Sequence, residues 1–204
     1  MTIATISTWG QIALSALIGG LVAVAGAVTV GRLVLGRTRR SAYADHLTGV
    51  ANRRAFVRRL QREWTHSAHD HTRLGLLVID VDAFGDINDL YGRETGDRVL
   101  AEVAERINLR VRSGDYVARL EADEFGVICP GSTEDEMAAL RRNLEAYVNY
   151  ARTAPVVLSI GIASRREDDD SFEDMLRRAR ESVLERRNER PIRAVDDALA
   201  ELLS

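Results

Sequence analysis

Nineteen consecutive residues near the N-terminus, Ile12–Val30, carry no charge and only two polar side chains. A helix needs about 20 apolar residues to cross a bilayer, so we predict a transmembrane helix over residues 12–35, after a short extracytoplasmic segment, 1–11. A cleaved signal peptide is disfavoured because the first eleven residues lack the basic residues that open one. A buried core helix of this length would show a polar stripe, which this stretch lacks.

Four arginines follow this stretch before the first acidic residue, Asp45: Arg32, Arg37, Arg39 and Arg40. Positive charge flanking a transmembrane helix stays on the cytoplasmic side. We therefore expect a single-pass protein of the cell inner membrane, with the lipid bilayer as one partner. A basic linker over residues 36–44 would lead to a cytoplasmic domain.

Small residues recur every four positions along the predicted membrane helix, at Gly19, Ala23, Ala27 and Gly31. Such a ridge lets two membrane helices approach closely, which favours a homodimer. Ala and Gly are common in membrane helices, so an accidental spacing remains the alternative.

After Asp45 the hydrophobic periodicity changes to that of a folded domain. The pattern predicts a helix from about residue 51, a strand 74–79, a helix through 99–107, strands 116–120 and 125–129, a capped helix 133–148, a strand 156–162 and a helix 171–187. After the first helix this is the βαββαβ order of ferredoxin-like folds. We predict an α/β (α+β) domain with a central, mostly antiparallel sheet.

In that topology the third strand lies between the first two and runs antiparallel to both. The start of strand 125–129 then falls beside the end of strand 74–79, and acids occupy both places: Asp80 and Asp82, and Asp123 and Glu124. Mg²⁺ in proteins takes oxygen ligands and uses one or two carboxylates together with phosphate oxygens. Solvated acids at strand ends are commonplace, so this spacing alone does not decide for a metal.

The composition of the chain limits the kinds of molecule that it can bind. All 28 basic residues are Arg, the net charge is −3, and the part after residue 44 is more acidic still. An acidic body is a poor partner for duplex nucleic acid, so we expect no nucleic-acid binding. The single cysteine, Cys129, excludes a disulfide framework.

Several motifs now become recognisable in order. Residues 45–56 read D-H-L-T-G-V-A-N-R-R-A-F, residues 80–89 read D-V-D-A-F-G-D-I-N-D, residues 119–125 read R-L-E-A-D-E-F, and residues 159–163 read S-I-G-I-A. Together they resemble the GGDEF domain of diguanylate cyclases, which have the cyclase-palm variety of this fold. The resemblance implies a GGDEF domain over residues 45–192, followed by a helical tail, 193–204.

Diguanylate cyclases condense two GTP molecules into cyclic di-GMP, so the resemblance implies GTP or cyclic di-GMP as partners and Mg²⁺ (or Mn²⁺) as cofactor. By position, the implied metal ligands are Asp80, the Val81 carbonyl, Asp123 and Glu124, of which Asp123 and Glu124 would be catalytic. The implied nucleotide-binding residues are Asn88, Asp97 and Arg187. A carboxylate such as that of Asp97 can accept hydrogen bonds from guanine N1–H and N2–H.

The sequence departs from the family at three places. The signature turn has Glu121-Ala122 where the family has Gly-Gly. A two-residue hairpin turn commonly needs positive φ, which costs about 1 kcal/mol or more for a residue with a Cβ, so we expect a reshaped turn. Gly85 stands where the family has a phosphate-binding Lys, and Arg187 stands for a second Lys. Glu121 would also repel nucleotide phosphates.

Arg112-Ser113-Gly114-Asp115 matches the family's R-x-x-D inhibitory site for cyclic di-GMP. Arginine can grip a phosphate or a guanine edge through paired donors. An ordinary solvent-facing ion pair between Arg112 and Asp115 is the alternative.

Three functions therefore compete. The first is a membrane-anchored GGDEF protein that binds guanine nucleotide, with cyclase activity weak or lost because of the altered turn and the missing Lys. The second is an active diguanylate cyclase, and the third is a non-catalytic dimeric scaffold. The retained acids favour the first over the third.

Overall fold

The computed structural model describes residues 42–148, 153–154 and 156–189. The predicted membrane helix 12–35, the segment before it, most of the basic linker and the tail 193–204 lie outside the described residues. Among the helices that are described, none combines the length and apolar character needed to cross a membrane. The chain divides into two compact units, Met1–Ala42 and Tyr43–Ser204, and the second contains the fold.

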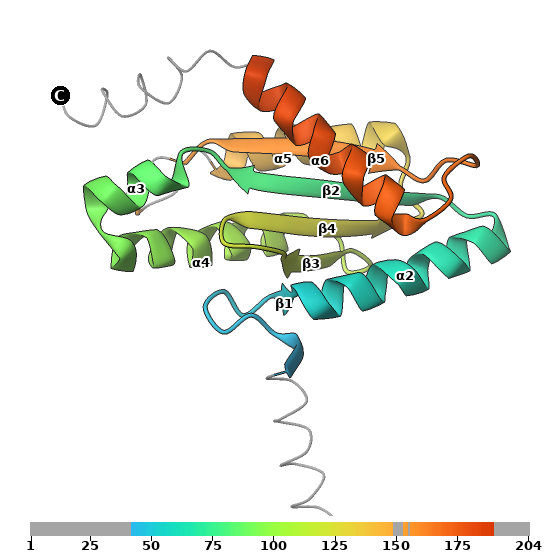
Figure 1. Ribbon diagram of the computed structural model, residues 1–204, viewed down its shortest axis with the longest axis horizontal. Coiled ribbons are helices and arrows are strands. Elements are labelled where there is room, and N and C mark those ends of the chain that lie inside the picture. Colours follow the sequence, from blue (N-terminus) through green and yellow to red (C-terminus); the bar gives the residue numbers. More distant parts are fainter. Residues whose placement is uncertain (1–41, 149–152, 155, 190–204) are drawn as a thin grey trace, which may run out of the picture. The chain divides into compact units, whose positions relative to one another are not determined.

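A five-stranded sheet forms the centre of this unit, in the order β1-β3-β4-β2-β5 (Figure 1). Its strands are β1 (Ala51–Asn52), β2 (Leu74–Val81), β3 (Tyr116–Arg119), β4 (Glu124–Pro130) and β5 (Leu158–Ser164). The short β1 pairs parallel to β3, whereas the other neighbouring strands are antiparallel. β4 lies between β2 and β3, as the predicted topology requires, so the mixed α/β fold with a mostly antiparallel sheet is confirmed.

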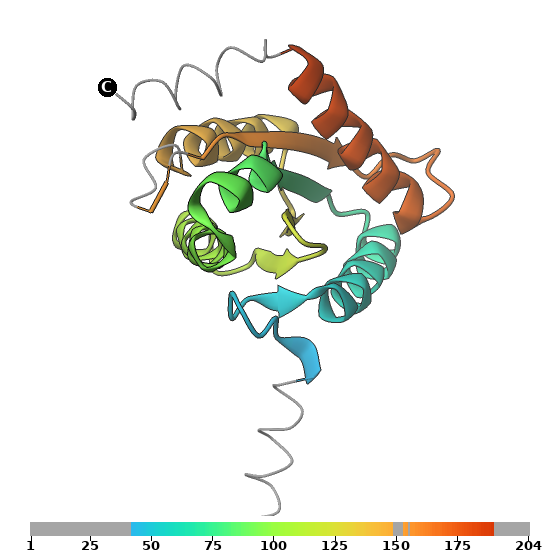
Figure 2. The same cartoon turned by 60° about the vertical axis from the view of Figure 1, so that its left-hand side comes forward.

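The helices are α2 (Arg53–Asp70), α3 (Phe84–Tyr91), α4 (Arg93–Arg110), α5 (Glu134–Val148) and α6 (Phe172–Glu189). Alternate side chains of β2 point to opposite faces of the sheet. Leu76 and Val78 pack with α2 and α6, whereas Leu77 and Ile79 pack with α4 and α5. Figure 2 shows these two helical layers on either side of the sheet. The core is therefore two apolar layers, and polar residues at the strand ends lie at their rim.

Two elements, β1 and α3, were not predicted from the sequence. Residues 51–52 form β1, and α2 begins only at Arg53, because the Asn52 side chain caps the helix by accepting from the Ala55 N–H at 3.0 Å. The separate helix α3 was not predicted, because its eight residues are too few for a clear periodicity. It ends at Gly92, whose φ of +83° separates it from α4.

The predicted capping box at the start of α5 is confirmed. The Thr133 N–H donates to the Glu136 carboxylate at 2.8 Å, and the Glu136 N–H donates to Thr133 Oγ1 at 3.1 Å. Each side chain thus satisfies a backbone donor that the helix leaves unpaired.

Candidate functional site

Two carboxylates face each other where β2 ends and β4 begins. Asp80 is directly opposite Glu124 in the antiparallel register, and the Val81 N–H donates to the Asp123 carbonyl at 3.2 Å. Since residues 76, 78 and 80 share one face of β2, Asp80 lies on the side of the sheet that α6 covers. We call Asp80, Asp82, Asp123 and Glu124 the acidic corner.

Helix α6 lies close to the sheet because Gly161 in β5 has no side chain. A Cβ at Gly161 would clash with the α6 backbone at Ala179 and Val183. This close packing brings two arginines of α6 to the acidic corner. They are Arg180 and Arg187, seven residues and about two turns apart, so they lie on the same face of the helix.

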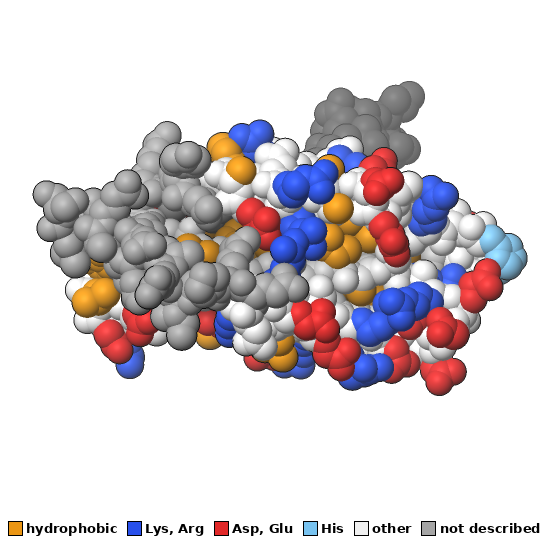
Figure 3. Space-filling view, turned by 90° about the horizontal axis from the view of Figure 1, so that it is seen from above, with side chains coloured by type: hydrophobic (Ala, Val, Ile, Leu, Met, Phe, Trp, Pro, Cys, Tyr) orange, Lys and Arg blue, Asp and Glu red, His pale blue; other side chains and the backbone are white. Residues whose placement is uncertain are grey.

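Each of these arginines binds carboxylates of the corner. Arg180 Nε and Nη2 donate to the two oxygens of Glu124 at 2.8 and 2.6 Å. Arg187 Nη2 donates to Asp80, and its Nε donates to Asp82 at 3.2 Å. Figure 3, viewed from the α6 side, shows basic and acidic side chains interspersed on this face.

Arg180 is a member of the site to which the sequence assigned no role, whereas Asp82 was expected among the converging acids but not among the metal ligands. Asp82 is 8% exposed and accepts a hydrogen bond from Ser159 Oγ at 2.9 Å, which ties β5 to the end of β2. The seven-residue spacing between Arg180 and Arg187 was visible in the sequence. Only the packing of α6 on β5 shows that both arginines reach the acids.

The electrostatics of the corner follow from burial and crowding. Burial raises the pKa of Asp80 to about 6, although Arg187 acts in the opposite direction and the neighbouring acids add to the rise. The hydrogen bonds to Glu124 raise the pKa of Arg180 above its ordinary value. The arginines thus offset a local excess of negative charge.

The signature turn carries Glu121 and Ala122 without backbone strain, because its shape differs from a two-residue hairpin. Among the described non-glycine residues only His71 and Ala83 have positive φ. The connection is longer than a two-residue hairpin: β3 ends at Arg119 and β4 begins at Glu124. The Arg119 guanidinium holds it by donating to the Ala122 carbonyl at 2.6 and 3.1 Å.

The Glu121 carboxylate is matched by basic groups. It lies 3.4 Å from Arg180 Nη2 and 3.5 Å from Arg53 Nη1. The predicted repulsion of phosphates by Glu121 is therefore partly offset by two guanidinium groups.

The predicted guanine-binding residues lie on neighbouring helices, Asn88 in α3 and Asp97 in α4. The Asn88 side chain packs against Gly96, where an added Cβ would clash with it. Asp97 is exposed and Gly85 has open space beside it. The structure thus brings Asn88 next to the turn of α4 that carries Asp97.

The acidic corner as described does not match a ready-made metal site. Within the described residues, no three His, Cys, Asp or Glu side chains are grouped so that they could hold an ion. Glu124 and Asp80 already accept hydrogen bonds from arginines. Metal ligation by Asp80, Val81, Asp123 and Glu124 therefore stays a prediction.

The R-x-x-D segment forms a closed turn between α4 and β3. Arg112 donates to Asp115 from Nε and from its backbone N–H, both at 3.1 Å. Its Nη2 also donates to the Pro130 carbonyl at 2.8 Å and to Ser132 Oγ at 2.6 Å. The Asp115 side chain is 4% exposed, and a pocket of about 340 Å³ lies beside this group.

Comparison with known proteins agrees with this arrangement. Residues 42–191 match the family model described as "Diguanylate cyclase, GGDEF domain". The chain is 34% identical over 134 residues to the uncharacterized protein YhcK of Bacillus subtilis, covering 65% of this chain and 36% of YhcK. It is 35% identical over 115 residues to diguanylate cyclase DosC of Escherichia coli K12, covering 56% of this chain and 25% of DosC.

A solved structure is similar over most of the chain. It is the coiled coil and GGDEF domain of DgcB from Caulobacter crescentus in complex with c-di-GMP, with a TM-score of 0.79 and 27% identity, covering 85% of this chain and 95% of that one. This chain belongs to the diguanylate cyclase GGDEF-domain family. It spans only 25–36% of the length of the two curated relatives above.

Proposed function

We propose that this chain is a membrane-anchored GGDEF-domain protein of cyclic di-GMP signalling that binds guanine nucleotide and has weak or no cyclase activity. The observation that carries the proposal is the acidic corner, where Asp80 faces Glu124 and arginines hold both. The acids expected for the family are present and adjacent, which supports a nucleotide site. Their engagement by arginines supports weak turnover.

Nucleotide binding is proposed to use residues on three elements. Asn88 and Asp97 would accept from the guanine edge, and Arg187, 44% exposed, would contact phosphate. Asp123 and Glu124 would be the catalytic acids of any residual activity. Two such domains would have to face each other for condensation, so we propose a homodimer.

We propose further that cyclic di-GMP binds at Arg112 and Asp115. The neighbouring pocket and the complex of the similar DgcB domain with c-di-GMP support this. Arg112 would have to exchange some of its bonds to Ser132 and Pro130 for bonds to the ligand.

Localisation at the inner membrane is proposed from the sequence alone, on the apolar stretch 12–30 and the arginines after it. Fractionation of cells that express the full chain, followed by carbonate extraction, tests it. Recovery in the soluble fraction would contradict the anchor.

An active cyclase is the second candidate, favoured by the partial exposure of Arg180 and Arg187, 37% and 44%, which would let them move from the acids. The test is to incubate the full chain in detergent micelles with GTP and Mg²⁺ or Mn²⁺ and to quantify cyclic di-GMP by chromatography. We expect little product, together with calorimetric binding of cyclic di-GMP that Arg112→Ala abolishes. Robust product would establish the active cyclase, and absence of any nucleotide binding would contradict both candidates.

A further inference from the structure

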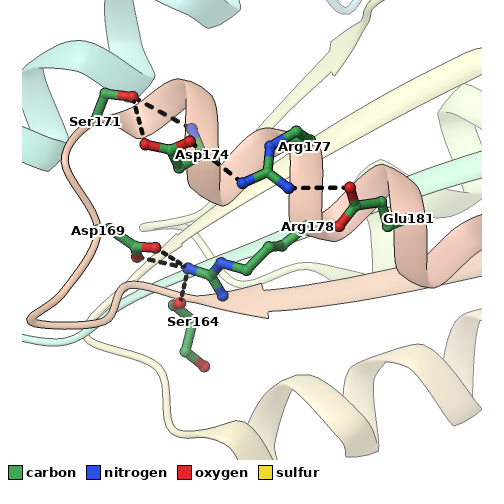
Figure 4. Close-up of polar contacts among 7 residues, drawn as sticks. All are labelled: Ser164, Asp169, Ser171, Asp174, Arg177, Arg178 and Glu181. Atoms are coloured by element: carbon green, nitrogen blue, oxygen red, sulfur yellow. Dashed lines mark hydrogen bonds and ion pairs between the residues drawn. The ribbon is translucent and has the colours of Figure 1, made fainter.

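The arginines of α6 differ in what they bind. In the first turns of the helix, Arg177 pairs with Asp174 and Glu181 of α6 itself (Figure 4). Arg180 instead reaches the first residue of β4, and Arg187 reaches the end of β2. Arg180 and Arg187 therefore place positive charge on the acidic corner from a different element.

The Arg180 guanidinium binds both carboxylate oxygens of Glu124. Nε and Nη2 contact the two different oxygens of the carboxylate, the fork geometry of a bidentate pair. The Glu124 side chain is 13% exposed, which leaves little of it open to another partner. A divalent cation that used Glu124 would have to displace this guanidinium.

We propose that Arg180 is the residue that keeps a divalent cation off the acidic corner, because it supplies the positive charge that a metal ion would otherwise bring. This inference rests on the proposed function, for which it gives the physical cause of weak turnover. Arg180 and a cation compete for the same two oxygens, and a guanidinium beside Glu124 also repels a second positive charge.

Partial exposure makes the competition measurable. The Arg180 side chain is 37% exposed and its other partner, Glu121, is 53% exposed. Because the guanidinium is partly exposed and Gln retains an amide donor for Glu124, Arg180 can be replaced without loss of the fold. Arg180→Gln removes the charge and keeps most of the side chain.

The experiment titrates the full chain in detergent micelles with Mn²⁺, without nucleotide, and follows free Mn²⁺ by electron paramagnetic resonance. Arg180→Gln is compared with wild type and with Arg177→Gln, a control on the same helix that lies outside the corner. We expect Arg180→Gln to bind Mn²⁺ about tenfold more tightly than wild type, because one positive charge near the ligands is gone. The control should bind like wild type, and Mg²⁺ should compete for the new site.

Equal Mn²⁺ affinity in wild type and Arg180→Gln, with both folded by circular dichroism, would overturn the inference. An equal gain in Arg177→Gln would also overturn it, because it would show a general charge effect. Arg180→Ala repeats the test without the amide of Gln. Failure of nucleotide binding would leave this result standing and would count against the proposed function alone.

Discussion

Two ion pairs of this domain, Arg112–Asp115 and Arg180–Glu124, join an arginine to an acid over very different separations along the chain. At the R-x-x-D turn the partners are three residues apart, and Arg112 seals Asp115, whose side chain is 4% exposed. At the acidic corner Arg180 and Glu124 are 56 residues apart, and the Glu124 side chain is 13% exposed. The local pair covers the more deeply buried acid, so we expect it to contribute more to folding stability than the long-range pair at the rim of the core.

The largest expected effect is at the turn. Arg112→Ala removes the bonds to Asp115, Pro130 and Ser132 and leaves a buried carboxylate uncompensated, so we expect a loss of about 2–3 kcal/mol in the free energy of unfolding. Urea denaturation measures it, with the exposed Arg98→Ala as control. A loss of stability no larger than that of the control would show that Arg112, like Arg180, contributes little to the stability of the fold.

The Asp45–Arg119 pair shows whether burial or separation along the chain decides how much an ion pair stabilises the fold. Its two residues are 74 positions apart, yet their side chains are only 16% and 14% exposed. Burial alone would raise the pKa of Asp45, but hydrogen bonds from Thr48 and Arg119 outweigh it and hold that pKa below 3.8. The ionised form is therefore favoured by folding. The stabilisation of the fold by ionised Asp45 is present above pH 3.8 and is lost as the pH falls through the lower pKa that Asp45 has in the folded state.

We accordingly expect Asp45→Asn to cost about 1–2 kcal/mol near neutral pH and to lose its disadvantage in acid. Denaturation of both proteins between neutral and acidic pH tests this. A difference that stays constant across the range would mean that the charge of Asp45 does not matter.

Substitutions in the signature turn should change the stability of the fold only slightly. Since Glu121 and Ala122 have no positive φ, the double change to Gly relieves no strain and loosens the unfolded chain further, with an expected loss of about 1 kcal/mol. We expect no gain in cyclic di-GMP synthesis. A clear gain would mean that the side chains themselves obstruct the nucleotide.

The smallest effect on stability is expected at the corner itself, where Gln keeps an amide donor for Glu124, so Arg180→Gln should cost about 0.5 kcal/mol. Chemical denaturation beside Arg177→Gln measures it. A loss above that of Arg112→Ala would reverse the comparison between the two groups.

The sequence alone predicted that β4 lies between β2 and β3 and that Asp80 meets Glu124, because both follow from hydrophobic periodicity and from the topology of the fold. It also predicted the capping box at Thr133, which depends only on local spacing. It did not predict α3, which is too short to show a helical periodicity, nor how the turn at Glu121 avoids backbone strain. It missed Arg180, whose partner is set by the close packing of α6 on Gly161.

Calorimetry of the full chain with GTP, with ATP as control, shows whether this domain binds guanine nucleotide. Asp97 is exposed on α4, so Asp97→Asn should preserve the fold while it removes the charged acceptor for guanine N1–H and N2–H. We predict binding of GTP and not of ATP, weakened about tenfold or more by Asp97→Asn. Equal heats for GTP and ATP, or no binding of either, would contradict specific binding of guanine nucleotide by this domain.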